Sequence, residues 1–134
     1  MNEQLKISNK ARQHVREMLS EYPQMKEEME QLRQSLMAVQ EDGSNQFSAF
    51  EANSAIKIVS HEQIHFRSLA LKVMEEVIAN TTIETQVIIN LRYFKREPLS
   101  WVAISLNDEV GYSEDNCRKL EKKLVDEIAK RLGW

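Results

Sequence analysis

The chain has few of the residues that interrupt helices, with 3 glycines and 2 prolines in 134 residues. Leu, Glu, Lys, Gln, Met and Ala, which favour helices or tolerate them, are common, and no convincing pair of strands is apparent. The sequence therefore predicts an all-α protein. Its length is that of one ordinary domain, or of a small domain with a helical extension, so it is long enough to bury a core.

Cysteine and long apolar runs are also scarce. Cys117 is the only cysteine, which excludes an intrachain disulfide and a zinc site built from cysteines, and which favours a reducing compartment. The N-terminal residues lack the apolar region of a signal peptide, and no stretch approaches the ~20 apolar residues that span a bilayer. We expect a cytoplasmic protein with no membrane partner, in which Cys117 is a small core residue.

Residue patterns typical of catalysis are missing as well. The sequence contains no glycine-rich phosphate loop and no plausible Ser, His and Asp triad. Aromatic residues make up 7% of the chain and are scattered, which argues against a platform on which unpaired bases stack. The sequence predicts no enzyme and no cofactor.

Positive charge is in deficit overall, because the net charge is −3 and the isoelectric point is near 5.7. A simple nucleic-acid-binding protein is basic, so this balance argues mildly against such a function. The distribution is uneven, however. Residues 84–134 contain nine Lys or Arg and nine Asp or Glu, so the C-terminal region is neutral and residues 1–83 carry the deficit.

Residues 81–134 read as three short helices separated by capping residues. Thr81 or Thr82 caps the first helix, which presents apolar residues on one side and ends at Pro98. Ser100 caps the second helix, and Gly111 closes it, because glycine accepts the left-handed conformation that follows a helix. The apolar residues of the first helix are Ile83, Val87, Ile88, Leu91 and Phe94.

A third helix begins after Ser113, which caps it. Its apolar residues recur at spacings of three and four and face inward. They are Cys117, Leu120, Leu124 and Ile128. The second and third helices form a helix-turn-helix, whose small core is expected to contain Trp101, Ile104, Tyr112, Cys117 and Leu120. This pattern predicts a protein that binds double-stranded DNA through its third C-terminal helix.

The outward face of that helix carries the predicted DNA contacts. Asn116 is expected to pair with adenine, Lys119 to donate to guanine, and Asp115 to accept from cytosine. The remaining four residues would hold phosphates, namely Ser113, Arg118, Lys122 and Lys123. The alternative is a charged face that only contacts solvent.

Four short segments of the C-terminal region resemble the helix-turn-helix of sigma-factor region four. They are residues 91–94, 99–101, 111–113 and 118–120. At the other end, residues 17–23 and the acidic run 26–33 are similar to the opening of RinA/ArpU-type phage regulators. That resemblance implies transcriptional activation of phage late genes, with host RNA polymerase as a partner.

The chain differs from the region-four pattern in two places. The second helix is about two residues longer, so Asn107 and Asp108 look inserted, and the linker at residues 95–98 is also longer. A rival interpretation is a helical adaptor that binds RNA polymerase or another protein and needs no preferred DNA sequence. The near-neutral charge of the C-terminal region suits this alternative.

Residues 1–40 form the predicted N-terminal helical segment. Ser8 or Asn9 caps a helix with an apolar face, and Pro23 then breaks or restarts it. That face consists of Ala11, Val15, Met18, Leu19 and Tyr22. A heptad-like seam follows, formed by Met25, Met29, Leu32, Leu36 and Val39. The seam predicts either a homodimer or a helix that folds back on its own domain.

Residues 41–52 are polar and read as a linker, and residues 53–80 as a long connecting helix. The long helix contains His61, Glu62 and His65 in the H-E-x-x-H order of zinc metalloproteases. A catalytic zinc also needs a third protein ligand, for which Glu75, Glu76 and Glu84 are candidates, and a wall that holds the substrate, which the sequence does not supply. We therefore expect no metal site and treat a metalloprotease as a remote alternative.

Overall fold

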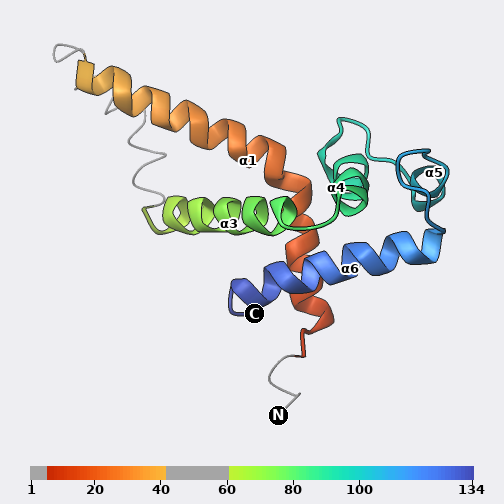
Figure 1. Cartoon of the computed structure of the whole chain (residues 1–134). Helices are drawn as coiled ribbons and strands as arrows, with labels where there is room; N and C mark the ends of the chain where they lie inside the picture. Colours follow the sequence, from red (N-terminus) through yellow and green to blue (C-terminus); the bar gives the residue numbers. More distant parts are fainter. Residues whose placement is uncertain (1–5, 42–60) are drawn as a thin grey trace. The chain divides into compact units, whose positions relative to one another are not determined.

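A computed structural model describes the backbone of residues 6–41 and 61–134, and the side chains of residues 6–35 and 65–134. The described residues form five α-helices and one π-helix and contain no strand, which confirms the all-α prediction. The elements are α1 (Asn9–Glu41), α3 (His61–Ala79), α4 (Ile83–Ile89), the π-helix η2 (Asn90–Phe94), α5 (Trp101–Ser105) and α6 (Glu114–Arg131), as labelled in part in Figure 1.

The chain divides into two compact units. The first unit consists of Met1–Tyr22 and Lys72–Trp134, and the second of Pro23–Leu71. The first turns of α1 therefore belong to the same unit as the C-terminal helices, whereas the sequence had suggested a separate N-terminal segment. Residues 42–52 of the predicted linker and residues 53–60 of the predicted long helix lie outside the described residues.

The N-terminal helix begins as predicted. The Ser8 hydroxyl accepts a hydrogen bond from the Ala11 amide at 3.1 Å, so Ser8 is the cap. Pro23 lies inside α1, and the prediction that it breaks or restarts the helix is wrong. A proline inside a helix costs about 3 kcal/mol. Burial of Leu19 before it and of Met25 after it helps to offset that cost.

The first unit has a core made of apolar side chains from its helices. The predicted face of α1 is confirmed, because Val15, Met18 and Leu19 are buried. Residues from the other helices complete this core, and they are Val73, Met74, Val77, Ile88, Ile89, Leu124, Val125, Ile128 and Ala129. Tyr22 stacks on Phe94 with ring centroids 4.7 Å apart, which adds an aromatic contact between α1 and η2.

The second unit contains parts of α1 and α3. Within it, Met25, Ala70 and Leu71 are buried, and Arg67 Nη1 lies 3.2 Å from Glu28 Oε2. Of the predicted seam, Met29 and Leu32 are half-buried, while Leu36 and Val39 have no described side chains. Homodimer formation through this seam stays a prediction.

The start of the C-terminal region follows the predicted cap but not the predicted end. The Thr82 hydroxyl accepts from the Thr85 amide at 3.2 Å, so α4 is capped as expected. The helical path continues through η2 and ends at Phe94, before Pro98, so Pro98 does not terminate it. Ile83, the first residue of α4, is 75% exposed and does not belong to the inward face.

Candidate nucleic-acid interface

The linker between η2 and α5 is held by two hydrogen bonds. The Leu99 amide donates to the Leu91 carbonyl at 3.0 Å, and Arg92 Nη1 donates to the Leu99 carbonyl at 3.0 Å. Both bonds tie Leu99 back to η2. Leu99 therefore anchors the start of α5 to η2 although the linker is longer than expected. In addition, α5 itself contacts η2.

The second helix is shorter than the sequence suggested. The Ser100 hydroxyl accepts from the Ala103 amide at 3.2 Å, which confirms the cap, but α5 ends at Ser105 rather than near Gly111. The Asn107 carboxamide oxygen accepts from the Glu109 amide at 2.9 Å and turns the chain away from the helix. The apparent insertion at Asn107 and Asp108 thus belongs to a turn-rich connection, not to a longer helix.

Gly111 adopts the left-handed conformation predicted for it, with φ = 68°. It lies in the connection ahead of α6 rather than directly after α5, so its predicted role as the close of the second helix is wrong. The Ser113 hydroxyl then accepts from the Asn116 amide at 3.3 Å and caps α6. Together these residues set the direction in which α6 begins.

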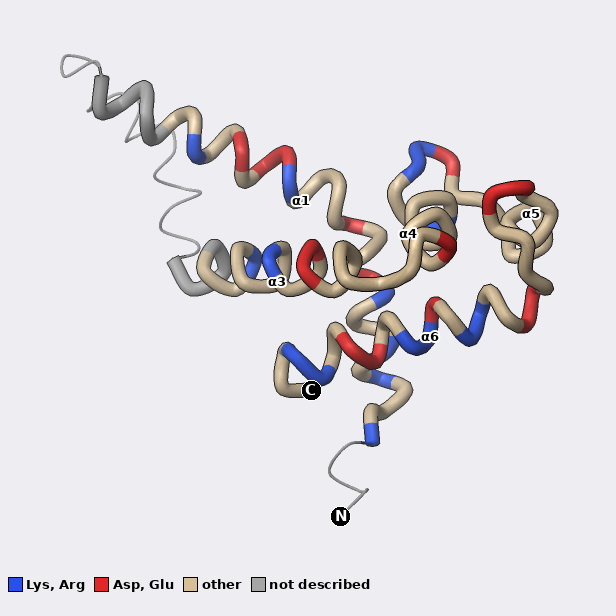
Figure 2. Tube along the Cα trace, in the orientation of Figure 1, with Lys and Arg blue, Asp and Glu red and all other residues tan. Residues whose placement is uncertain are grey.

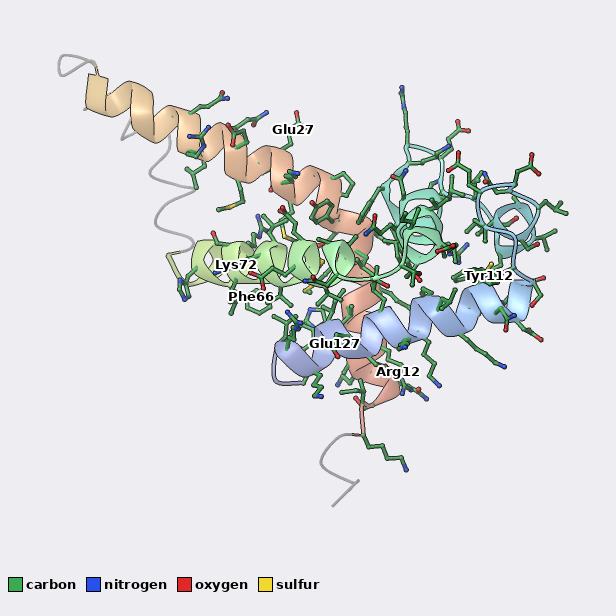
Figure 3. All side chains as sticks on the ribbon, viewed as in Figure 1. Arg12, Glu27, Phe66, Lys72, Tyr112 and Glu127 are labelled. Carbon is green, nitrogen blue, oxygen red and sulfur yellow. The ribbon has the colours of Figure 1, made fainter. Side chains whose placement is uncertain are left out.

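The predicted small core is largely confirmed. Ile104 and Cys117 are fully buried together with Ile88, Leu91 and Val110, and Trp101 and Leu120 pack against them. Burial raises the pKa of the Cys117 thiol, so it stays protonated and apolar in character. Tyr112 is 39% exposed and is not part of this core. Figure 3 labels Tyr112 near the N-terminal end of α6.

All seven predicted DNA contacts are exposed on the surface of α6 or at its cap. Asn116, Lys119 and Lys123 follow one another at spacings of three and four, so they share the face opposite buried Leu124 and Ile128. Lys119, Lys122 and Lys123 form no ion pair with the described residues. Figure 2 shows the Lys and Arg residues of α6 in blue and its Asp and Glu residues in red.

The N-terminal end of this surface is less favourable for phosphates than its middle. Glu114 and Asp115 occupy the first turn of α6, where carboxylates complement the helix dipole. Glu114 Oε1 lies 2.8 Å from Arg118 Nη2, so Arg118 already has one anionic partner. Of the cations predicted to hold phosphates, Lys122 and Lys123 are therefore the two without an ion pair among the described residues.

Glu121 is a buried charged residue of α6 that the sequence interpretation missed. It is 2% exposed and accepts hydrogen bonds from Arg16, of which the shortest are 3.0 Å from Nε to Oε2 and 2.9 Å from Nη2 to Oε1. Tyr93 also donates its hydroxyl to Glu121. Its position four residues after Cys117 and three before Leu124, on the apolar face, was a signal that a partner had to exist.

Electrostatics in this network follow from the same contacts. The hydrogen bond with Glu121 raises the pKa of Arg16. Burial and the hydrogen bond to Glu121 raise the pKa of Tyr93, which stays a protonated donor. A second ion pair joins the same two helices, since Arg12 Nε lies 2.6 Å from Asp126 Oδ1. The first turns of α1, drawn in red in Figure 1, cross α6 where these pairs form.

The C-terminal end of α6 is also fixed to α1. Gly133 has φ = 81°, the Trp134 amide donates to the Ala129 carbonyl at 2.9 Å, and the Gly133 amide donates to Lys130 at 3.1 Å. This pair of bonds is a Schellman motif. It directs the Trp134 indole onto His14, with ring centroids 4.5 Å apart. Both ends of α6 and its middle are therefore held in a defined position.

The H-E-x-x-H segment lies at the start of α3, but the side chains of His61 and Glu62 are outside the described residues. His65 is exposed. Where side chains are described, no group of three or more His, Cys, Asp or Glu could hold a metal ion. No helix within the described ranges is both long and apolar enough to cross a membrane.

Comparison of the chain with protein-family models, with curated proteins and with solved structures finds no match. The exposed face of α6 and the contacts that hold this helix are the structural features that bear on function.

Proposed function

We propose that the protein is a sequence-specific regulator of transcription that binds double-stranded DNA through the exposed face of α6. The observation that carries this proposal is the row of cations at Lys119, Lys122 and Lys123, which pair with no described residue and lie on a helix whose other face is buried. A helix with one exposed basic face fits the width of the major groove. Lys122 and Lys123 would contact phosphates, and Lys119, together with residues nearer the start of α6, would reach base edges.

Asn116 is the residue best placed to read a base. It is exposed one turn before Lys119, and its side-chain carboxamide forms no hydrogen bond with the described residues. A free carboxamide can pair with adenine through two hydrogen bonds. Asp115 lies beside it and would accept from cytosine, while repelling phosphates that approach the first turn.

The contacts between α1 and α6 support the proposal because a DNA-reading helix must be held in one orientation. Arg16 holds the middle of α6 through Glu121, and Arg12 holds the next turn through Asp126. Preorganised side chains lose less conformational entropy when they bind. By its resemblance to phage regulators, the protein would activate late genes together with host RNA polymerase.

The affinity for random-sequence duplex DNA, measured by fluorescence anisotropy between about 50 and 200 mM salt, tests the electrostatic part of the proposal. We expect the logarithm of the binding constant to fall with the logarithm of the salt concentration with a slope near −3. That slope corresponds to about three or four phosphates at 0.9 per contact. Binding that does not depend on salt would contradict it.

A second candidate is supported by two exposed apolar residues. Val102 of α5 is 55% exposed, Leu106, the residue that follows the last residue of α5, is 76% exposed, and the acidic residues Asp108 and Glu109 come after them. Exposed apolar residues near charges are typical of protein-binding surfaces. The protein would then act as an adaptor for RNA polymerase or another protein. Firm binding to immobilised polymerase that is lost on Leu106→Ser, without any preferred DNA sequence, would support the adaptor.

A further inference from the structure

Two guanidinium groups lie against the same indole ring in the first unit. The Arg92 guanidinium carbon is 4.7 Å from the centre of the Trp101 ring, and that of Arg118 is 5.6 Å from it. Arg92 comes from η2, Trp101 from α5 and Arg118 from α6. Three elements thus bring two positive charges to the same indole ring.

These two charges are only partly compensated. Arg118 pairs with Glu114 at 2.8 Å, and in the part of the chain that the structure describes neither arginine has another ion pair. Arg92 uses Nη1 to donate to the Leu99 carbonyl, while its Nε and Nη2 form no hydrogen bond with described residues. Because the two guanidinium groups carry like charges and repel each other, an anion that approaches them stabilises the pair. It retains unused donors that such an anion could accept from.

We propose that Arg92 and Arg118 together bind one phosphodiester group of the DNA backbone beside Trp101. The inference rests on the proposed DNA-binding function and extends the interface from α6 onto η2. Guanidinium groups match the geometry of phosphate oxygens with parallel N–H donors, and stacking on an indole limits the orientations that each group can take. Arg92 is not among the DNA contacts predicted from the sequence. Its position over Trp101 makes it a phosphate contact in this proposal.

The test measures duplex affinity as a function of salt for wild type, Arg92→Gln, Arg118→Gln and the double variant. We expect each single variant to bind all sequences about tenfold more weakly, as for loss of one charged hydrogen-bonding group. The double variant should lower the salt slope by about 0.9, which is the value for one shared phosphate. A loss of about 1.8 would overturn the proposal, because it would indicate two separate phosphates.

The matched control is Lys72→Gln, which removes one exposed cation from α3 (Figure 3). The salt slope of Lys72→Gln should equal that of wild type. If Lys72→Gln loses as much affinity for duplex DNA as Arg92→Gln does, the proposal is overturned, because the loss in both variants would then reflect net charge alone. Arg92→Lys keeps the charge but not the fork, so it should retain the wild-type slope and lose affinity. This variant covers the case in which Arg92→Gln fails to fold.

The outcomes separate this inference from the proposed function. If wild type binds duplex DNA with a sequence preference and Arg92→Gln binds equally well, the phosphate site is wrong and the DNA-binding function stands. If wild type binds no duplex DNA, the proposed function fails and the phosphate site fails with it. A changed sequence preference in Arg92→Gln would also contradict a contact that reads only the backbone.

Discussion

Arg16 on α1 and Glu121 on α6, which are 105 positions apart in the chain, form a bidentate ion pair. Glu121 is 2% exposed, so its charge is removed from water and is balanced by Arg16 and by the Tyr93 hydroxyl. A buried carboxylate without such partners would destabilise the fold strongly. The pair therefore makes the position of α6 depend on the N-terminal helix, although the two are remote in sequence.

Arg16→Ala should destabilise the protein, because Glu121 would remain buried with Tyr93 as its main partner. The expected loss is about 2 kcal/mol, below the usual cost of breaking a fully buried pair, because Arg16 itself is 40% exposed. Urea unfolding monitored by circular dichroism measures it. Arg33→Ala, which breaks the exposed pair with Glu30, is the control and should leave the unfolding midpoint unchanged. Equal midpoints for Arg16→Ala and wild type would show that the pair does not stabilise α6.

Gly111→Ala should also destabilise the protein, but through the backbone. The glycine has φ = 68°, and a Cβ atom placed there would meet nothing within 4 Å, so the cost is conformational strain of about 1 kcal/mol. Gly111→Asn should cost less than Gly111→Ala, because asparagine tolerates the left-handed region. The order of the thermal midpoints, wild type, Asn and then Ala, checks this. Equal stability of all three would mean that the turn adopts another conformation.

Removing both Lys122 and Lys123 should reduce the salt dependence of DNA binding without changing the preferred sequence. Replacement by glutamine is expected to lower the slope by about 1.8, or 0.9 for each phosphate. Anisotropy titrations at four salt concentrations measure the slope. The control is the double variant Lys10→Gln, Lys72→Gln, which removes two exposed cations from α1 and α3. An identical loss in the control would show that net charge, and not this face of α6, sets the affinity.

Local signals in the sequence were sufficient for the helix starts and for the amphipathic faces. Ser8, Thr82, Ser100 and Ser113 cap helices in the structure because each hydroxyl has a backbone amide three residues later to accept from. The spacing of Cys117, Leu124 and Ile128 correctly indicated the buried side of α6. Both kinds of signal depend on contacts within a few residues, which a sequence displays directly.

Helix ends and long-range contacts were not predictable in the same way. Pro98 and Gly111 suggested where two helices stop, but tertiary contacts at Leu99 and the turn at Asn107 end them earlier. The contacts of Arg12 and Arg16 with α6 span more than a hundred residues, so no local pattern reveals the partner. A charged residue on an apolar face indicates only that a partner exists.

Selection of binding sites from a random duplex pool at near-physiological salt tests the central claim most directly. Wild type should enrich one sequence motif, and Asn116→Ala should bind that motif about 1 to 3 kcal/mol more weakly and with a blunted preference. A two-fold repeat in the motif would also support a homodimer. If wild type enriches no motif, or if Asn116→Ala loses affinity equally for all sequences, α6 does not read DNA bases through Asn116 as proposed.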